Sequence, residues 1–389
     1  MTAEFDFDTP VDRHATGSYK WDSSGDREVI PLWVADMDFR TAPAIIEALR
    51  KRVDHGVFGY VKVPDEYYEA LTGWNMRRHG WSIDPEMVIY TSGVVPAVSA
   101  IIKALTRPGD GVIVNTPAYN CFFSSIRNNS CTIVENPLRR IDCGDSFTYV
   151  FDFESLETVC ADPANKLLIL CNPHNPTGRI WTREELERIA TICHRHGVTV
   201  VSDEIHCELT LPGREYVPYA TIDPDAVVCC SPSKAFNIAG LQIANIVAPS
   251  EPVRAVIDRA INDNEVCDVN PFGVVALISA YTTGEPWLDA LRGYIAENYR
   301  ALLDFFAAEL PQLKVCRLEA TYLAWVDIQP LGIDSTRLEE YALETEKVWV
   351  NAGAMYGTKG YIRINMACPR SRLLEGLRRL CRAVDNIKK

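Results

Sequence analysis

Residues 166–202 read KLLILCNPHNPTGRIWTREELERIATICHRHGVTVVS, and this stretch decides the fold. Its apolar beginning, residues 166–171, is typical of a short strand that is buried on both faces. Thr182 and Glu185 form a capping box, apolar residues then recur at helical spacing, and Gly197 marks the end of the helix. A second apolar strand, residues 198–202, follows at once. This order of elements predicts a parallel crossover unit.

The same alternation of strand and helix recurs on either side of that unit, around residues 87–90, 96–105, 111–115 and 226–230. It predicts a large α/β domain over residues 46–284. After a turn at residues 282–286 the pattern changes to a long helix, residues 287–310, followed by the strands 314–317, 322–328 and 361–366 and the helices 335–344 and 370–387. We expect residues 285–389 to form a smaller α+β domain. Residues 1–45 show little periodicity and are expected to be an arm that packs with the small domain.

Composition excludes several classes of protein. The chain has 389 residues, of which 47% are hydrophobic and 23% charged, as in ordinary globular proteins. A net charge of -13 repels phosphate backbones and anionic lipid, so neither nucleic acid nor a membrane is an expected partner. The longest nearly apolar run, residues 272–281, is far short of the roughly 20 residues that a bilayer span needs. The acidic start of the chain does not resemble a secretory signal, and we expect a cytoplasmic protein.

Cysteine spacing and the absence of common motifs narrow the chemistry. The thirteen cysteines include no C-x-x-C pair, which favours reduced thiols over a disulfide framework or a zinc ribbon. No dinucleotide-binding, P-loop or H-E-x-x-H motif occurs. His194 and His196 look like solvated residues at a helix end, and His206-Cys207-Glu208 lacks a partner at ligand spacing. No metal site is therefore expected.

Lys234 is the only charged residue between Ala226 and Ser250, and it follows a predicted buried strand. Desolvation at such a place lowers the pKa of an amine, and a neutral amine can act as a nucleophile or a base. A lysine that forms a Schiff base has this property. The pattern also fits a lysine whose aliphatic chain lies along the strand end while its ammonium group stays in water.

Polar residues follow two neighbouring strands at the edge where open α/β sheets bind ligands. Asp203 and Glu204 come after the strand 198–202, and a carboxylate there can pair with a cationic ring nitrogen. A single Asp is more often a helix cap or a turn residue. The loop CNPHNPTG, residues 171–178, contains Asn175 and suits hydrogen bonding to a planar cofactor better than it suits a simple turn.

Two further features fit an anion and a carboxylate. Gly93 and Val94 lie where a strand passes into a helix, and exposed amides at the positive end of a helix suit a phosphate group. Ser231 and Ser233 can donate hydrogen bonds to the same anion, or can cap a turn. In YIRIN, residues 361–365, Arg363 suits a substrate carboxylate, although an exposed strand arginine is the commoner explanation of that pattern alone.

Taken together, Asn175-Pro-Thr-Gly178, Ser202-Asp-Glu204 and Ser231-Pro-Ser-Lys234, with Arg363 near the end, resemble the fold-type I pyridoxal-phosphate (PLP) enzymes of the class I/II aminotransferase superfamily. KWD at 20–22, LWVADMDF at 32–39, FGY at 58–60 and SGVVPAV at 92–98 are similar to the MalY/PatB-type cystathionine β-lyases, also called cysteine-S-conjugate β-lyases. This similarity extends over essentially the whole chain. It implies an aspartate aminotransferase-like α/β fold, with a large, mostly parallel sheet flanked by helices and a smaller α+β domain.

The resemblance also implies how the cofactor PLP would be held. Lys234 would carry it covalently, Asp203 would pair with its pyridine nitrogen, and Asn175 would bind its ring hydroxyl oxygen. Tyr119 would stack on the ring, and His206 would lie beside it in a role that stays open. The phosphate contacts implied by the resemblance are Gly93, Val94, Ser231, Ser233 and, from a partner subunit, Tyr60.

For the substrate, the resemblance implies that Arg363 binds the carboxylate, with Trp33, Asp36, Asn175 and Tyr119 around it. Lys234, Tyr60 and Arg363 are the expected catalytic residues. The broad superfamily pattern has an arginine eight residues after the lysine, where this chain has Gln242.

The implied activity is α,β-elimination from a sulfur amino acid, in a homodimer with its active sites at the subunit interface. The products would be a thiol such as homocysteine, pyruvate and ammonia. An aminotransferase of the same superfamily shares the early steps, and the catalytic residues alone do not separate the two activities. A regulatory protein that keeps the fold is a third possibility, against which the intact Lys234, Asp203 and Asn175 argue.

Overall fold

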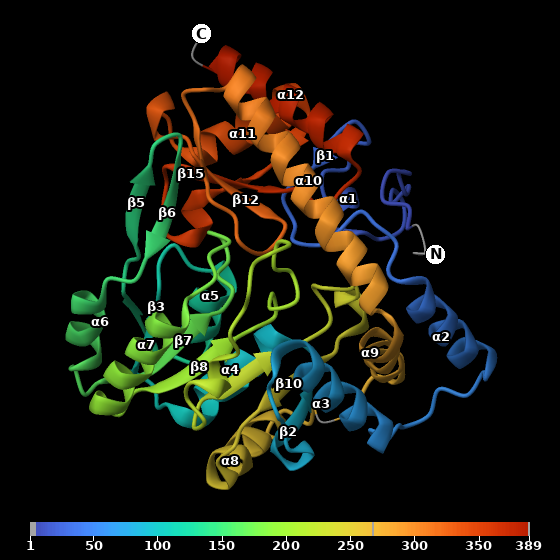
Figure 1. Cartoon of the computed structure of the whole chain (residues 1–389), viewed down its shortest axis with the longest axis vertical. Coiled ribbons are helices and arrows are strands. Elements are labelled where there is room, and N and C mark those ends of the chain that lie inside the picture. Colours follow the sequence, from blue (N-terminus) through green and yellow to red (C-terminus); the bar gives the residue numbers. More distant parts are fainter. Residues whose placement is uncertain (1–4, 267, 388–389) are drawn as a thin grey trace.

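The computed structural model describes residues 5–266 and 268–387, which form two large sheets with helices packed around each (Figure 1) and one small two-stranded sheet. The larger sheet has seven strands in the order β2-β10-β9-β8-β7-β3-β4. Their bounds are β2 Val88–Thr91, β3 Gly111–Val114, β4 Thr132–Glu135, β7 Asn165–Cys171, β8 Thr199–Asp203, β9 Val227–Cys230 and β10 Ala244–Val247. Only β10 runs antiparallel to its neighbours, so the predicted mostly parallel α/β sheet is confirmed.

Helices cover both faces of this sheet, and its central strands are accordingly buried at nearly every position. In β7, Leu167 and Ile169 pack into the core that contains α4 and α5, whereas Leu168 and Leu170 pack against α6 and α7. The helices of this part are α2 Pro43–Asp54, α3 Asp65–His79, α4 Val94–Leu105, α5 Asn120–Asn128, α6 Phe153–Cys160, α7 Arg183–His196, α8 Glu251–Asn262 and α9 Pro271–Thr283. The predicted crossover β7–α7–β8 is present, with the capping box of Thr182 and Glu185 at the start of α7.

The second sheet has six strands in the order β14-β15-β12-β11-β6-β5. Its strands are β5 Arg139–Cys143, β6 Ser146–Val150, β11 Lys314–Cys316, β12 Leu323–Asp327, β14 Asn351–Ala352 and β15 Tyr361–Asn365. The helices α10 Glu285–Glu309, α11 Ser335–Glu346 and α12 Arg370–Ile387 pack on it. In Figure 1 the long helix α10 joins the two parts. Where the chain divides into domains stays a prediction.

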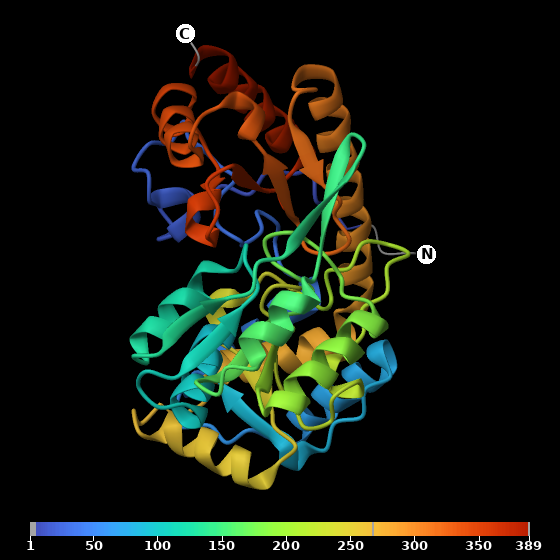
Figure 2. The ribbon, with the colours of Figure 1, turned by 90° about the vertical axis from the view of Figure 1, so that its left-hand side faces the viewer.

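One hairpin joins the second sheet from within the range that the sequence assigns to the large domain. Strands β5 and β6 extend from the lower part to the upper sheet, where β6 pairs in parallel with β11 (Figure 2). Phe147 and Tyr149 on β6 are buried and contact the cluster that includes Trp325 and Tyr361. The sequence analysis predicted neither this hairpin nor β10, because short strands paired with distant segments leave a weak local pattern.

The N-terminal segment packs against the second sheet and its helices. After the short helix α1 Tyr19–Asp22, strand β1 Ile30–Pro31 pairs in parallel with β13 Val348–Trp349. The backbone amide of Asn365 then donates to Leu32 O at 2.9 Å, and that of Asp38 donates to Ala367 O at 2.8 Å. These contacts carry residues 33–38 toward the carboxyl edge of the large sheet.

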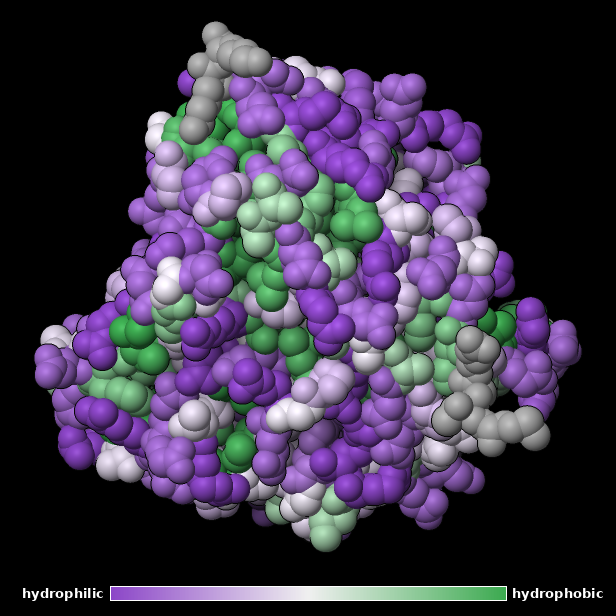
Figure 3. Space-filling view, turned by 45° about the horizontal axis from the view of Figure 1, so that its top comes forward, coloured by the Kyte–Doolittle hydropathy of each residue, from purple (hydrophilic) through white to green (hydrophobic). Residues whose placement is uncertain are grey.

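The face drawn in Figure 3 is largely hydrophilic, with apolar side chains in groups between polar ones, as a chain of net charge -13 suggests. Among residues 5–266 and 268–387, none of the helices combines the length and apolarity needed to cross a bilayer.

Candidate active site

A cavity of about 200 Å³ lies at the carboxyl edge of the large sheet. Asp203 is the last residue of β8, Asn175 follows β7, and Lys234 follows β9. Because these three strands are neighbours, their polar residues lie together at the carboxyl edge of the sheet. This is the edge at which open α/β sheets bind ligands. The lining residues are Ala35, Gly93, Val94, Val95, Pro96, Tyr119, Cys171, Asn175, Asp203, Ile205, His206, Ser233, Lys234 and Ala239.

The Lys234 amine is enclosed and faces charges of both signs. Its Nζ donates to Ala35 O at 2.7 Å. Burial, followed by the positive charge of Arg363, lowers the pKa of Lys234 to about 8, although Asp36 and Asp203 act in the opposite direction. The predicted desolvation is therefore present, and the explanation with an ammonium group in water does not apply.

Asp203 is buried, and its carboxyl group accepts a hydrogen bond from the backbone of the following loop. Burial raises the pKa of Asp203 to about 7, while the Ile205 amide, which donates to Oδ1 at 3.1 Å, partly offsets that rise. The adjacent Glu204 accepts hydrogen bonds from the Tyr219 amide at 2.9 Å and the Ser202 hydroxyl at 2.8 Å, and also from the Tyr216 hydroxyl. A cationic ring nitrogen in the cavity would stabilise the charged form of Asp203.

Arg363 is 3% exposed, so the explanation as an exposed strand arginine is wrong. Its Nη1 donates to Asn175 Oδ1 at 3.2 Å and its Nη2 to Trp33 O at 2.9 Å, which ties β15 to the loop after β7 and to the N-terminal segment. The guanidinium lies 4.9 Å from the centre of the Tyr356 ring. Its buried Nε has no hydrogen-bond partner in the described chain, which leaves a donor for a carboxylate ligand.

The residues predicted to bind an anion lie near the start of α4. Gly93 precedes the first turn of that helix, which begins at Val94, and both residues line the cavity. Ser231 Oγ donates to Ile243 O at 2.5 Å and lies 2.9 Å from Ser233 Oγ. Backbone amides at a helix start together with a serine hydroxyl suit a phosphate group.

Of the remaining predicted residues, two line the cavity and three do not. Tyr119 and His206 line the cavity, and burial lowers the pKa of His206 to about 3, so its imidazole is neutral. Trp33 stacks on Trp349, with ring centres 4.0 Å apart, and Asp36 pairs with Arg13 at 2.7 Å. Tyr60 is 96% exposed on the connection between α2 and α3 and does not reach the cavity of its own chain.

Comparisons with known proteins identify the family of this chain. Residues 27–380 match the family model described as aminotransferase class I and II. Cystathionine β-lyase PatB of Bacillus subtilis is 42% identical, covering 97% of this chain and all of that protein. The chain belongs to the class I and II aminotransferase family. The resemblance to its cystathionine β-lyase branch is therefore confirmed.

Solved structures of this family place the same fold around a cofactor. Cystalysin from Treponema denticola, whose structure contains pyridoxal 5'-phosphate, has a TM-score of 0.95 and 36% identity, covering 99% of this chain and 100% of that chain. The PLP-bound C-S lyase from Staphylococcus hominis has a TM-score of 0.91 and 33% identity, with 98% of each chain covered. The expected aspartate aminotransferase-like fold is confirmed.

The residues of this family member also fit such a cofactor on their own terms. His206 Nδ1 is buried at the cavity without a partner among the described residues, so a ligand has a polar atom to meet there. Asp203 is suited to a cationic ring nitrogen, Lys234 to an aldehyde and the start of α4 to a phosphate. Together these groups match the functional groups of PLP. Gln242, at the position of the superfamily arginine, is exposed and does not line the cavity.

The sequence analysis missed residues that hold segment 33–38 over Lys234. The Asn237 amide accepts from the Met37 amide at 2.9 Å and donates to Met37 O and Phe39 O at 2.9 and 2.8 Å. The Tyr322 hydroxyl donates to Ala35 O at 2.9 Å. Asn237 has a positive φ of 54°, which asparagine tolerates well. In the sequence, the position of an asparagine three residues after Lys234 was the one indication of this role.

Proposed function

We propose that this protein is a PLP-dependent carbon–sulfur β-lyase that cleaves L-cystathionine or related L-cysteine S-conjugates. The products are a thiol, pyruvate and ammonia, and with cystathionine and water the thiol is homocysteine. The family membership and the lyases among its relatives support this proposal. The observation that carries it is the position of Lys234, whose amine lies in a cavity that also contains Asp203 and Asn175 and has a pKa of about 8.

Substrate binding depends on Arg363. Its buried guanidinium has an unpartnered Nε and is fixed through Nη1 and Nη2, so a carboxylate that binds it is held in one orientation. Arg363 also adds to the positive charge near Lys234. A bound carboxylate offsets that charge and holds the substrate Cα near the Lys234 amine.

Proton transfer is assigned to Lys234. A pKa of about 8 leaves a useful fraction of the amine neutral near pH 8, and the neutral Nζ accepts the proton from the substrate Cα. Bound PLP supplies an electron sink for the charge left on Cα, which allows a thiolate to leave from Cβ. Asp203 keeps a positive charge on the ring nitrogen favourable, because a buried carboxylate is stabilised by a cation beside it.

The decisive assay measures pyruvate from L-cystathionine without any added keto acid. We expect pyruvate and a thiol to form in equal amounts with the wild-type protein. Lys234→Ala should abolish turnover, whereas Lys166→Ala, which removes a solvent-exposed amine, should leave it unchanged. Product formation that requires a keto acid would instead identify an aminotransferase and would overturn the proposal. Pyruvate yields across a panel of cysteine conjugates would then rank the substrates.

We also propose that the active enzyme is a homodimer. Tyr60 is 96% exposed, and the neighbouring Val57 and Phe58 are 63% and 55% exposed, which groups large apolar side chains on one connection. Such groups on a surface are typical of protein–protein contacts. In the dimer Tyr60 reaches the phosphate group in the partner's site. We further assign the enzyme to cysteine and methionine metabolism in the cytoplasm, where its free thiols stay reduced.

A further inference from the structure

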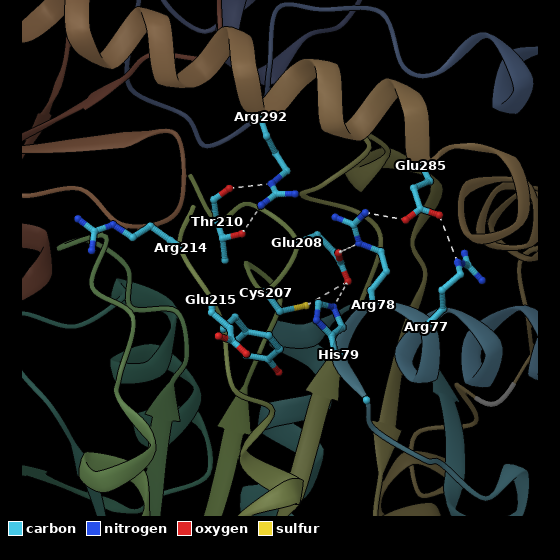
Figure 4. A pocket seen from close by; sticks show the side chains of 12 residues that line it. Arg77, Arg78, His79, Cys207, Glu208, Thr210, Arg214, Glu215, Glu285 and Arg292 are labelled. Carbon is cyan, nitrogen blue, oxygen red and sulfur yellow. Dashed lines mark hydrogen bonds and ion pairs between the residues drawn. The ribbon is translucent and has the colours of Figure 1, made fainter. Parts of the chain in front are cut away.

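Three different metal-binding side chains meet outside the catalytic cavity. His79 is the last residue of α3, and Cys207 and Glu208 lie in the loop that follows β8. The imidazole nitrogen, the thiol sulfur and a carboxylate oxygen all lie within 4.8 Å of one another. Figure 4 shows the three side chains converging from two segments of the chain. The sequence analysis found no partner for Cys207 and Glu208 because His79 precedes Glu208 by 129 residues.

We propose that His79 Nε2, Cys207 Sγ and the Glu208 carboxylate bind one Zn²⁺ ion and leave its fourth position open to the adjacent cavity. One sulfur, one imidazole nitrogen and one carboxylate oxygen are the ligand types that zinc prefers. Three protein ligands with a fourth position free are characteristic of open zinc sites. Calcium and magnesium favour sites made of oxygen alone, so these ligands select against them.

Of the two ligand–ligand distances that involve Glu208 Oε1, one matches a tetrahedral zinc site and the other is shorter. Typical zinc–ligand bond lengths place sulfur and oxygen about 3.6 Å apart and nitrogen and oxygen about 3.4 Å apart. Cys207 Sγ lies 3.8 Å from Glu208 Oε1, which already matches. His79 Nε2 lies 2.6 Å from the same oxygen, so these two atoms must separate by about 0.8 Å when the ion enters between them. On binding, the thiol proton of Cys207 passes to solvent, and the proton shared by His79 Nε2 and Glu208 Oε1 moves to His79 Nδ1 or to solvent.

Buried neighbours hold the ligands in place. The Trp74 indole donates to Glu208 Oε1 at 2.6 Å, and Arg78 Nε lies 3.3 Å from Glu208 Oε2. The Tyr216 ring packs edge-on against His79, with ring centres 5.1 Å apart. Cys207 and Glu208 are 8% and 3% exposed. Such outer contacts orient ligands and reduce the reorganisation that metal binding requires.

The cavity beside this cluster has a volume of about 580 Å³ and gives an ion access from solvent. Arginines line it, but acidic groups offset most of their charge. Arg78 pairs with Glu285 at 2.8 Å and with Asp289 at 3.2 Å, and Asp289 also pairs with Arg292 at 3.1 Å. A thiolate and a carboxylate leave the bound site itself neutral. Because the Glu208 carboxylate already faces Arg78, binding Zn²⁺ with loss of one thiol proton adds one positive charge there, which the nearby Glu285 and Asp289 face.

The same cluster is adjacent to the catalytic site in sequence but separate from it in space. Cys207 follows His206, which lines the catalytic cavity, whereas Cys207 and Glu208 line the larger one. An ion bound there would join the end of α3 to the loop that follows Asp203. The proposal does not depend on the activity proposed above, because its tests measure the metal.

The first test titrates Zn²⁺ into the holoenzyme by calorimetry in buffer free of chelators and counts the retained metal by mass spectrometry. We expect one zinc per chain in the wild type. Cys207→Ser and His79→Gln should weaken binding by more than the roughly 10–100-fold that loss of an outer contact costs. Matched controls are Cys381→Ser, which removes another free thiol, and His55→Gln, which removes an exposed histidine that lies outside both this cluster and the group His194, Asp223 and Asp225. Both controls should bind zinc as the wild type does.

Either of two results would overturn the proposal: a wild type that retains no zinc, or Cys207→Ser and His79→Gln variants that retain as much as the wild type. Co²⁺ gives a second readout that needs no variant to fold. A tetrahedral site with a thiolate gives intense visible bands at longer wavelengths than the cofactor absorbs. Weak bands typical of octahedral Co²⁺ in the wild type would contradict the ligand set.

Discussion

Burial brings the pKa values of Lys234 and Asp203 closer to 7, lowering the first and raising the second. It lowers that of Lys234 to about 8 and raises that of Asp203 to about 7, because removal from water disfavours the charged form of each. Without a cofactor these are unfavourable charges in the same cavity. A cationic ring nitrogen beside Asp203 and a covalent bond at Lys234 would remove the free-energy cost of burying each charge. The site therefore favours the bound cofactor and destabilises the apoprotein.

We predict that Asp203→Asn stabilises the apoprotein in a pH-dependent way. Folding raises the pKa of Asp203 from 3.8 to about 7, so between these values the folded chain binds a proton that the unfolded chain has lost. The contribution of Asp203 to the free energy of unfolding therefore falls as the pH rises from about 4 to 7. Asp203→Asn should match the wild type near pH 4 and exceed it by roughly 1–4 kcal/mol near pH 8.

Urea unfolding of the two apoproteins across that pH range measures this difference. Asp304→Asn, at an exposed position on α10, is the control and should follow the wild type throughout. A difference of the same size at both ends of the range would show that Asp203 is not the titrating group.

Arg363 yields a prediction about substrate affinity. In the wild type, the Arg363 guanidinium contacts Asn175 and Trp33 through Nη1 and Nη2, and its Nε stays available to a substrate carboxylate. Arg363→Lys keeps the positive charge but loses this planar arrangement of donors. Because a charged hydrogen bond contributes about 1.5–3 kcal/mol, kcat/KM for cystathionine should fall roughly 10–150-fold, mainly through KM. Steady-state kinetics measures the effect, and Arg259→Lys on the surface of α8 should leave the kinetics unchanged. A change confined to kcat would argue for a role after binding.

At the scale of elements, a buried ion cluster fixes the N-terminal segment. Asp38 accepts from Lys20 at 3.1 Å, from the Trp21 indole at 2.9 Å and from Arg372 at 3.2 Å, so it joins α1 to α12. Burial alone would raise the pKa of Asp38, but these partners hold it below the usual value. Because segment 33–38 lies between this cluster and Lys234, the cluster also positions the wall of the active site.

We predict that Asp38→Asn lowers the free energy of unfolding by about 3–5 kcal/mol at neutral pH, because it removes the buried carboxylate that neutralises Lys20 and Arg372. Because folding lowers the pKa of Asp38, its contribution to the free energy of unfolding is present above its ordinary pKa. That contribution is lost as the pH falls through the pKa of Asp38 in the folded protein. Asp12→Asn removes an exposed pair with Arg27 and should change stability by less than about 1 kcal/mol. Urea unfolding measures both, and equal effects of the two variants would contradict the prediction.

Local signals explain which elements the sequence could predict. The crossover β7–α7–β8 follows from apolar strands, the capping box of Thr182 and a left-handed Gly197, all of which act within a few residues. Strand β10 and the hairpin β5–β6 are short and owe their place to distant partners, and local patterns do not contain that information. The burial of Arg363 likewise depends on segment 33–38, which crosses β15 from the far end of the chain.

At the scale of the whole molecule, the proposed role of Tyr60 requires a second chain. Tyr60 lies on the exposed connection between α2 and α3, away from the cavity of its own chain. In the proposed twofold dimer, Tyr60 of each chain would enter the partner's cavity, because a twofold axis repeats every contact in both directions. Light scattering should therefore give twice the chain mass of 43.6 kDa.

We predict that two inactive variants restore activity to each other when mixed. Lys234→Ala and Tyr60→Phe should each be nearly inactive alone, because one loses the amine and the other the phosphate contact. A mixed dimer has one site with both substitutions and one site with neither, so random exchange should recover about a quarter of wild-type activity. The mixture is refolded or incubated until subunits exchange and is assayed for pyruvate. A mixture that stays inactive after exchange, or Tyr60→Phe with full activity alone, would show that each site is complete within one chain.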